Sequence, residues 1–376
     1  MRKSIVLIAT ALIILSGCLS ANQPTQTSNS VENEQRSGEA SYPSGSTANK
    51  TSTSPSKANT TKPVNNTTSV EDVYARDSHK FALFISTGYT TCGTGIPSNA
   101  PLGDGLFYLS LTFADYFVNN CSFNPNNILQ LSDFNLYHSG KDYEPKYKSQ
   151  YFDVHKCRSS TLAEVKLAIN ELIEKANKYS DSEVFIYIVD HGSNGLLDGD
   201  AERTFDSCII LYDNVLWDYE LTEMLAPLKS TKCCVIIDSC NAGGFANKLI
   251  FGLENPMSDG CSRKDWIVIT ASSWATFSYL FTNDDPKQGP YGAQLLWYMY
   301  DGFVTGNADG WGKHIVPGHG AANEHSVDGV VSIEESFYYQ MGFYQRPGDG
   351  GTAYLPPPSE ESQPQINDQY SGEFFL

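Results

Sequence analysis

The sequence predicts an α/β fold with a mainly parallel sheet and helices on both faces. Two kinds of segment carry this prediction: short runs that are apolar throughout, and longer stretches with apolar residues at helical spacing. The two kinds alternate from about residue 80 to about residue 343. Strands buried on both faces of a parallel sheet are apolar at every position, and helical crossovers connect them.

The predicted elements follow one another in a regular order. The clearest helix, 161–179, places Leu162, Val165 and Ile169 on one face with charges between them. Strands are expected at 80–86, 126–133, 184–190, 233–238 and 266–273, and 208–213 is a further short apolar run. Further helices are expected at 106–120, 219–230, 292–303 and 333–343.

The first residues predict export and anchoring. Arg2 and Lys3 precede an apolar run, 4–15, that is of signal-peptide length and too short to span a membrane comfortably. It ends in Leu-Ser-Gly before Cys18, which resembles the lipobox of prokaryotic lipoproteins. This resemblance implies cleavage before Cys18, its lipidation, and an extracytoplasmic protein attached to a membrane through its N-terminal lipid. The alternative is an uncleaved signal anchor with an incidental cysteine.

Composition divides the rest of the chain. After the signal peptide (1–17), residues 18–72 hold the lipidated cysteine and a Ser-, Thr- and Asn-rich tether that is expected to be disordered, because it has almost no large apolar side chains to bury. The enzyme-like domain is expected over 73–345, and a Pro- and Gly-rich tail over 346–376.

Charge and cysteine usage exclude several classes of protein. With 25 basic and 43 acidic residues, a net charge of −18, the chain lacks the concentrated basic surface that nucleic-acid binding needs, so no nucleic-acid partner is expected. None of the nine cysteines forms a Cys-x-x-Cys pair, which argues against zinc. A bridge between Cys92 and Cys121 is permitted outside the cell, whereas Cys233 and Cys234 fit a buried strand.

Two apolar strands end in residues that can do chemistry. The first, 184–190, is followed by His191 and Gly192, and the second, 233–238, is followed by Ser239 and Cys240. Ligand sites of open α/β sheets lie beyond the C-terminal ends of the strands, so the imidazole and the thiol are expected there together. A thiolate is a good nucleophile, an imidazole can take its proton, and backbone N–H groups beside glycines can stabilise an oxyanion.

These two motifs resemble those of a known group. An apolar strand ending in His-Gly, followed roughly fifty residues later by one ending in an acidic or amide residue, a small residue and Cys, is the pattern of caspase-like cysteine peptidases. The sequence Asp-His-Gly-Ser-x-Gly at 190–195 is most similar to legumains (peptidase family C13), which include the GPI-anchor transamidase subunit. The likeness runs from Lys80 to Phe343 and includes the segments 216–225 and 269–273. It implies a caspase-like three-layer sandwich.

The resemblance also implies roles for individual residues. His191 would be the catalytic histidine and Cys240 the nucleophile, with the N–H groups of Gly192 and Cys240 as the oxyanion hole. Asp238, with Ser239 beside it, would line the pocket for the side chain before the cleaved bond, where a carboxylate suits a basic or amide group. The alternative for Asp238 is a loop-capping carboxylate.

What orients His191 is open. Legumains carry an asparagine after the first strand that supports the histidine, and the matching segment here, 86–93, has none. Asp190 is adjacent, but neighbouring strand residues point to opposite faces, so a structural role is favoured for it.

Residues 322–337 allow two interpretations. With Gly329 at the sixth place of a calcium loop, the oxygen ligands would be Glu324, Ser326, Asp328 and Glu335. Equally, Ser332 and Glu335 fit a capping box that begins a helix. The predicted chemistry requires no cofactor, so Ca²⁺ would be structural.

The sequence therefore predicts a lipid-anchored, extracytoplasmic cysteine endopeptidase acting on a protein or peptide through a Cys-His dyad and a thioester. Two alternatives stay open: a transpeptidase or transamidase that uses the same site, and an inactive binding lipoprotein that kept the scaffold.

Overall fold

The computed structural model describes residues 70–91, 101–196, 203–250, 252–281, 283–313, 320–344 and 363–376. The chain divides into two units, Met1–Thr68 and Ser69–Leu376, and every described residue belongs to the second. The predicted signal peptide, Cys18 and nearly all of the predicted tether lie outside the described residues. Among the described residues, no helix is long and apolar enough to cross a membrane.

A six-stranded sheet forms the centre of the domain, as predicted. Its spatial order is β11-β8-β7-β3-β1-β2, and all neighbours are parallel except β11, which runs antiparallel to β8. The chain builds outward in one direction from β1 to β2 and in the other from β3 through β7 to β8, so the order reverses between β1 and β3. The strands are β1 (Lys80–Ser86), β2 (Ile128–Ser132), β3 (Glu183–Val189), β7 (Lys232–Asp238), β8 (Trp266–Thr270) and β11 (Gln365–Asp368).

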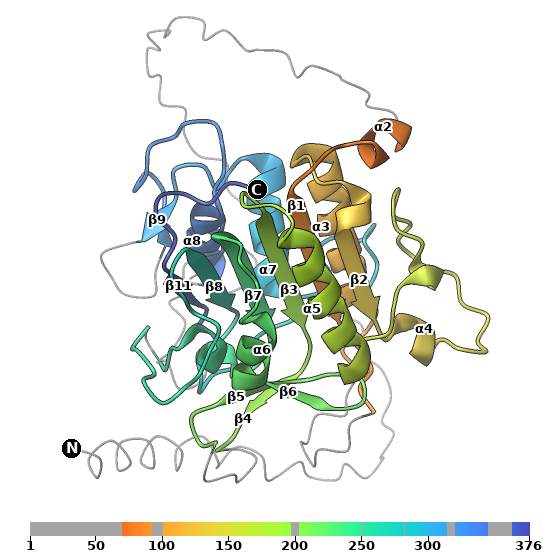
Figure 1. Cartoon of the computed structure of the whole chain (residues 1–376), viewed down its shortest axis with the longest axis horizontal. Helices are drawn as coiled ribbons and strands as arrows, with labels where there is room; N and C mark the ends of the chain where they lie inside the picture. The colour runs from red at the N-terminus through yellow and green to blue at the C-terminus, as the bar shows by residue number, and fades with distance from the viewer. Residues whose placement is uncertain are drawn as a thin grey trace, which may run out of the picture. The chain divides into compact units, whose positions relative to one another are not determined.

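Helices cover both faces of this sheet, which makes three layers (Figure 1). Alternate residues of each strand point to opposite faces: Phe84 joins one core with α3, α7 and α8, whereas Leu83 and Ile85 join the other with α5 and α6. The helices are α3 (Gly105–Asn120), α5 (Leu162–Ala176), α6 (Asp218–Leu225), α7 (Gln294–Thr305) and α8 (Ile333–Tyr344), with short α2 (Val70–Tyr74) and α4 (Phe134–Tyr137). The predicted α/β class, with a mainly parallel sheet and helices on both faces, is confirmed.

A small second sheet lies where the parallel strands end. It contains β4 (Gly192–Asn194), β5 (Ser207–Ile210) and β6 (Val215–Trp217), paired antiparallel in the order β4-β5-β6. Figure 1 shows this sheet below the tips of β3 and β7. Only Asp190 and His191 separate β3 from β4, so the chain at His191 passes directly from one sheet into the other.

Three turns of 3-10 helix and two very short strands complete the described elements. The turns are η1 (Pro125–Asn127), η2 (Val154–Lys156) and η3 (Ala242–Ala246), and the strands β9 (Gly312–Lys313) and β10 (Gly320–Ala321) pair with each other. Only η3 concerns the site, because it follows Cys240 directly along the chain.

The two ends of the predicted domain differ from the structure. Residues 70–72 were assigned to the tether but belong to α2, in which Val73 is buried. Residues from 346 onward were predicted to be a tail, yet β11 pairs with edge strand β8, and Phe374 is buried against α8. Proline, glycine and charge at 346–362 hid a short strand whose single ladder covers an otherwise open sheet edge.

Six described cysteines are free thiols: Cys121, Cys157, Cys233, Cys234, Cys240 and Cys261. Cys233 and Cys234 fill the two cores on opposite faces of β7, as predicted. Cys92, the other member of the permitted bridge, lies outside the described residues, and Cys121 is a free, buried thiol.

Candidate active site

The two sequence motifs meet at one end of the sheet. β3 and β7 are parallel neighbours in which Val189 is paired with Asp238, so two residues further along His191 and Cys240 stand at the same level. Their backbones touch: a Cβ atom placed on Gly192 would lie 2.1 Å from the Cys240 carbonyl oxygen. Glycine is therefore required at 192, because a side chain of any size would push the two motifs apart.

The Cys240 thiol is half-buried and faces a loop that the sequence analysis did not single out. Its Sγ lies 3.8 Å from the Ser278 hydroxyl and 4.0 Å from the Ser278 carbonyl oxygen. Burial raises the pKa of the Cys240 thiol, and the contacts with Ser278 act in the opposite direction. The resting thiol is therefore protonated at neutral pH, and it needs a base to become a nucleophile.

The backbone N–H and carbonyl groups of His191 are both held by hydrogen bonds. Its N–H donates to the Asp190 carboxylate, and its carbonyl oxygen accepts from the Ile210 N–H at 2.9 Å. Asp190 is buried, which raises its pKa well above the usual range. Asp190 thus holds the main chain of His191, in agreement with the structural role favoured from the sequence.

Asp238 lies underneath the site and faces the α7 layer. Its Oδ2 accepts from the Tyr187 hydroxyl at 3.3 Å and from the Leu296 N–H, in the first turn of α7, at 3.4 Å. Only 1% of Asp238 is exposed, and burial raises its pKa to about 7. Within the described part of the chain, the other oxygen, Oδ1, has no hydrogen-bond partner.

Ser239 is fully buried between the two motifs. Its carbonyl oxygen accepts from the Ser272 hydroxyl at 2.8 Å, and its Oγ would be 2.7 Å from a Cβ on Gly192. Ser239 therefore packs the contact between the strand ends, and its side chain is not displayed on the surface.

Two asparagines, one in β4 and one directly after Cys240, bind the loop that leads to Ser278. The side-chain amides of Asn194 and Asn241 both donate to the Trp274 carbonyl oxygen, at 2.8 and 3.1 Å. Asn241 has a left-handed backbone (φ 54°), a conformation that asparagine tolerates better than most residues. The only sequence signal for this arrangement was the polar Asn-Ala-Gly-Gly segment directly after the thiol.

The candidate calcium loop is built around other contacts. Both oxygens of the Glu335 side chain accept backbone N–H groups, one from Gly310 at 2.7 Å and one from Ser332 at 2.8 Å, and the Ser332 hydroxyl accepts the Glu335 N–H. This is the capping box that the sequence offered as the alternative. Glu335 is buried, whereas Glu324, Ser326 and Asp328 lie at or near the surface.

A metal site would have to reuse these groups. Across the described ranges, no group of three or more His, Cys, Asp or Glu side chains is arranged to hold a metal ion. The calcium site stays a prediction.

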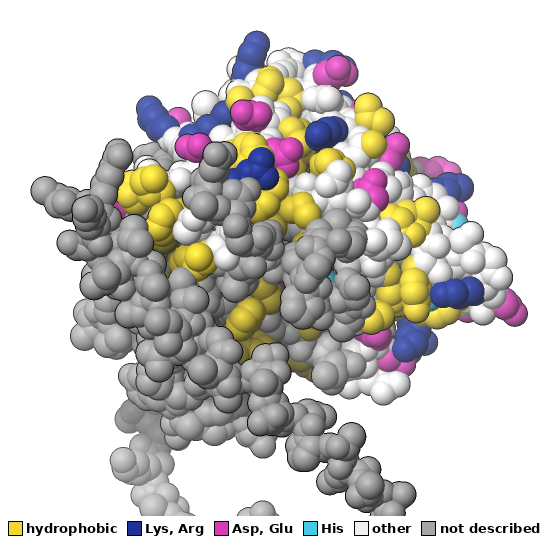
Figure 2. Space-filling model, turned by 90° about the horizontal axis from the view of Figure 1, so that it is seen from below, with side chains coloured by type: hydrophobic (Ala, Val, Ile, Leu, Met, Phe, Trp, Pro, Cys, Tyr) yellow, Lys and Arg dark blue, Asp and Glu magenta, His cyan; other side chains and the backbone are white. Residues whose placement is uncertain are grey.

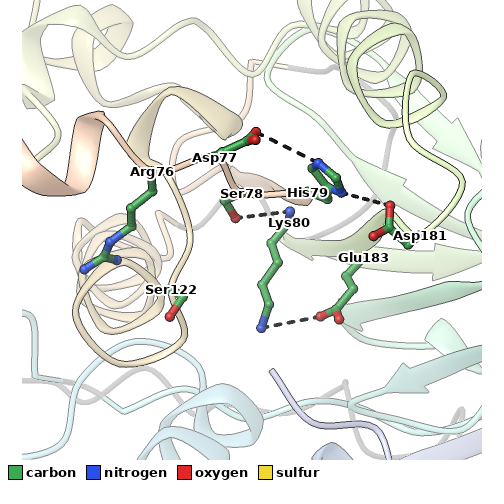
Figure 3. Close-up of a pocket in the computed structure, with 8 residues that line it drawn as sticks. All are labelled: Arg76, Asp77, Ser78, His79, Lys80, Ser122, Asp181 and Glu183. Carbon is green, nitrogen blue, oxygen red and sulfur yellow. Dashed lines mark hydrogen bonds and ion pairs between the residues drawn. The ribbon is translucent and has the colours of Figure 1, made fainter.

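A separate groove lies at the opposite end of the sheet. It measures about 540 Å³ and is lined at the N-terminal ends of β1 and β3 by paired charges (Figure 3). His79 is 2.8 Å from Asp181, and Lys80 is 3.5 Å from Glu183. The groove contains neither sequence motif.

The face seen from below in Figure 1 is chemically mixed. Figure 2 shows hydrophobic, acidic and basic side chains interspersed on its described part, with lysines and arginines standing singly or in small groups.

Comparison with known proteins finds one family model that matches part of the chain. Residues 134–302, which include both His191 and Cys240, match the family model of the caspase domain. A search of curated proteins finds no match. Among solved structures, protein GSU0716 from Geobacter sulfurreducens superposes with a TM-score of 0.40 at 12% identity, covering 74% of this chain and 95% of that one.

Residues 134–302 are thus similar to a caspase domain, and this similarity supports a cysteine-peptidase-like enzyme. The matched segment begins at α4 and ends within α7, so it contains β3, β7 and the small sheet between them. The match does not distinguish legumains from other caspase-like families.

Proposed function

We propose that this protein is a cysteine endopeptidase of the legumain-like kind, in which His191 and Cys240 form the catalytic dyad. The observation that carries the proposal is that the two residues each follow by two positions the paired ends of adjacent parallel strands, Val189 and Asp238, with the Gly192 backbone in contact with the Cys240 carbonyl group. Both residues are partly exposed, as a reacting pair must be, whereas the residues that hold them are buried.

The reaction proceeds through a thioester. The His191 imidazole takes the thiol proton, and the Cys240 sulfur attacks the carbonyl carbon of the scissile peptide bond. The N–H groups of Gly192 and Cys240 stabilise the developing oxyanion, and the imidazolium returns the proton to the leaving amine. Water, deprotonated by His191, then attacks the thioester and releases the acid product and the free thiol.

Asp238 is our candidate for the floor of the pocket that receives the side chain before the cleaved bond. Its support is the buried carboxylate with one oxygen unpartnered among the described residues. A cationic or amide side chain of the substrate would supply the missing donor. We therefore expect cleavage after Lys, Arg or Asn in preference to acidic residues.

Cys18 completes the proposal: its lipidation would anchor the chain at a membrane outside the cytoplasm, with residues 19–72 as the spacer. A Cys18→Ala variant should then move from the membrane fraction to the soluble fraction, without change in the activity of the domain.

The test is a peptide-library digest with the purified full chain. Mass spectrometry would identify the cleaved bonds and, after an acid quench, an acyl group on Cys240. Added amine that appears in the products instead of water would make the enzyme a transpeptidase on the same site. No cleavage and no acyl adduct across a complete library would favour the binding-lipoprotein alternative.

A further inference from the structure

A buried carboxylate lies beneath the turn that follows Cys240. Asp218, the first residue of α6, has no exposed surface. Its Oδ2 accepts from the Ser207 N–H at 2.9 Å and lies 3.0 Å from the Ser258 hydroxyl, and its Oδ1 accepts from the Tyr219 N–H at 2.8 Å. Burying a carboxylate is unfavourable unless hydrogen bonds replace the lost hydration, so these contacts are needed to keep Asp218 in the core.

Ser207 and Ser258 connect Asp218 to the turn that follows Cys240, residues 241–244. The Ser207 hydroxyl donates to the Asn241 carbonyl oxygen at 2.5 Å and accepts from the Gly244 N–H at 2.9 Å. The Ser258 hydroxyl lies 2.7 Å from the Gly244 carbonyl oxygen. Asn241, which is bonded directly to Cys240, and Gly244 are thereby fixed at both ends of the turn.

Close packing makes this arrangement specific. A Cβ atom on Gly244 would lie 2.4 Å from Asp218 Oδ2 and 2.6 Å from Ser207 Oγ, so only glycine lets the turn descend onto the carboxylate. Ser207 also stands opposite Asn194 in the β4–β5 pair, and β4 begins immediately after His191. One buried network therefore touches both the thiol side and the imidazole side of the site.

We propose that Asp218 is a positioning residue: through Ser207 and Ser258 it holds the turn after Cys240, and with it the thiol, in register with His191. The inference rests on the proposed function, because it takes Cys240 as the reacting group. Asp218 does not contact the thiol, so it acts through the two serines and the backbone of the turn.

The hydrogen bonds of the Ser258 hydroxyl depend on whether Asp218 is protonated, so the network is sensitive to pH. The Ser258 hydroxyl has one proton, which it can give either to Asp218 or to the Gly244 carbonyl oxygen. When Asp218 is protonated, it can donate to Ser258, which is then free to donate to Gly244. Burial raises the pKa of Asp218 to about 7, and the ionisable side chains that act on it are Asp206 and Cys261.

The experiment measures the alkylation rate of Cys240 by iodoacetamide in the purified full chain, with mass spectrometry to locate the label, from about pH 5 to pH 9. The variants are Asp218→Asn, Ser258→Ala and the control Glu334→Gln. Glu334 is also a buried carboxylate with a pKa raised to about 7 by burial, but it accepts the Phe374 N–H at the C-terminus.

We expect Asp218→Asn to slow Cys240 labelling at neutral pH about tenfold or more and to alter its pH profile, because misplacement of a reacting group by about 1 Å carries a large rate penalty. Glu334→Gln should keep the wild-type rate and profile.

Each other outcome decides a separate point. Wild-type rate and profile in Asp218→Asn would overturn the positioning role. If Asp218→Asn exposes the buried cysteines to label, the fold has been lost and Ser258→Ala decides: selective slowing of Cys240 supports the role, and an unchanged rate rejects it. A wild-type Cys240 that labels no faster than the other cysteines would reject the proposed function itself.

Discussion

Each end of the central sheet carries a histidine near carboxylates, but the two ends have different chemistry. At the N-terminal ends of the strands, His79 and Lys80 lie in an open groove and pair with Asp181 and Glu183 (Figure 3). At the C-terminal ends, His191 stands level with a thiol, and the carboxylates around it are buried and bound to backbone N–H groups.

This difference shows that residue type alone does not make a site. Exposed ion pairs are screened by water and salt, so each contributes little to stability. Buried carboxylates such as Asp238 and Asp218 instead have raised pKa values, because burial disfavours the charged form. At the C-terminal end the fold thus places carboxylates with raised pKa values close to the candidate dyad, and clusters of shifted groups are typical of functional sites.

The largest expected effect is the difference in kcat/KM between variants of His191 and of His79. His191→Ala and Cys240→Ala should each lower kcat/KM for peptide cleavage by about a thousandfold or more, since nucleophile and base act as one unit. His79→Ala should leave kcat/KM within about twofold, because its partners lie at the other end of the sheet. Steady-state kinetics on one cleaved peptide measures all three, and a comparable loss in His79→Ala would break the comparison.

The next effect tests the contact between the two motifs. In Gly192→Ala the new Cβ would meet the Cys240 carbonyl oxygen at 2.1 Å, so the strand ends must separate. We expect kcat to fall about a hundredfold while the domain stays folded, because a small displacement of reacting groups has a large effect on rate.

Gly140→Ala is the control for this variant. Gly140 has a positive φ of 72°, which Gly192 does not, and a Cβ there would meet nothing within 4 Å. That change should lower the free energy of unfolding by about 1 kcal/mol and leave kcat unaltered. Full activity in Gly192→Ala would show that the motifs tolerate separation and do not act together.

The sequence was sufficient for the elements that repeat a simple pattern. The strands 80–86, 184–190 and 233–238 were predicted within a residue or two, because runs such as that of β3 are buried on both faces. The meeting of His191 and Cys240 followed from their places after two parallel strands. Neither inference needed knowledge of distant contacts.

The sequence was insufficient where long-range packing decides the structure. Asp218 begins a helix and reads as an ordinary surface carboxylate, and only the fold shows that it is buried under Gly244. Ser278 likewise lies 38 residues from Cys240 with no motif around it. Strand β11 was missed because its four residues carry no hydrophobic alternation strong enough to outweigh the proline-rich stretch before them.

A smaller effect concerns stability and its dependence on pH. The pKa of Asp238 is about 7 in the folded protein and about 3.9 in an unfolded chain, so the folded state binds the proton more tightly between those values. Its contribution to stability is therefore fully present below about pH 4 and is lost as the pH rises through about 7. Asp238→Asn, which cannot ionise, should unfold at a higher temperature than wild type at pH 8 and at a similar temperature at pH 4.

Thermal unfolding at the two pH values measures this effect, expected to be about 1–3 kcal/mol at pH 8. The same variant should also change the preferred residue before the cleaved bond, if Asp238 is the pocket floor. An Asp238→Asn protein with wild-type pH dependence would mean that Asp238 is already ionised and satisfied in the folded state.

The smallest effect belongs to the exposed end of the sheet. Asp181→Asn removes the partner that lies 2.8 Å from His79, but the carboxylate is largely exposed and the pair is screened. We expect the free energy of unfolding to fall by less than about 1 kcal/mol at pH 6, and by still less in high salt. Because His79 also stacks on Tyr179 with ring centroids 3.9 Å apart, its position should survive the loss of the ion pair. Chemical denaturation in low and high salt measures the difference, and a salt-independent loss of several kcal/mol would show that this groove, too, holds its charges in a desolvated state.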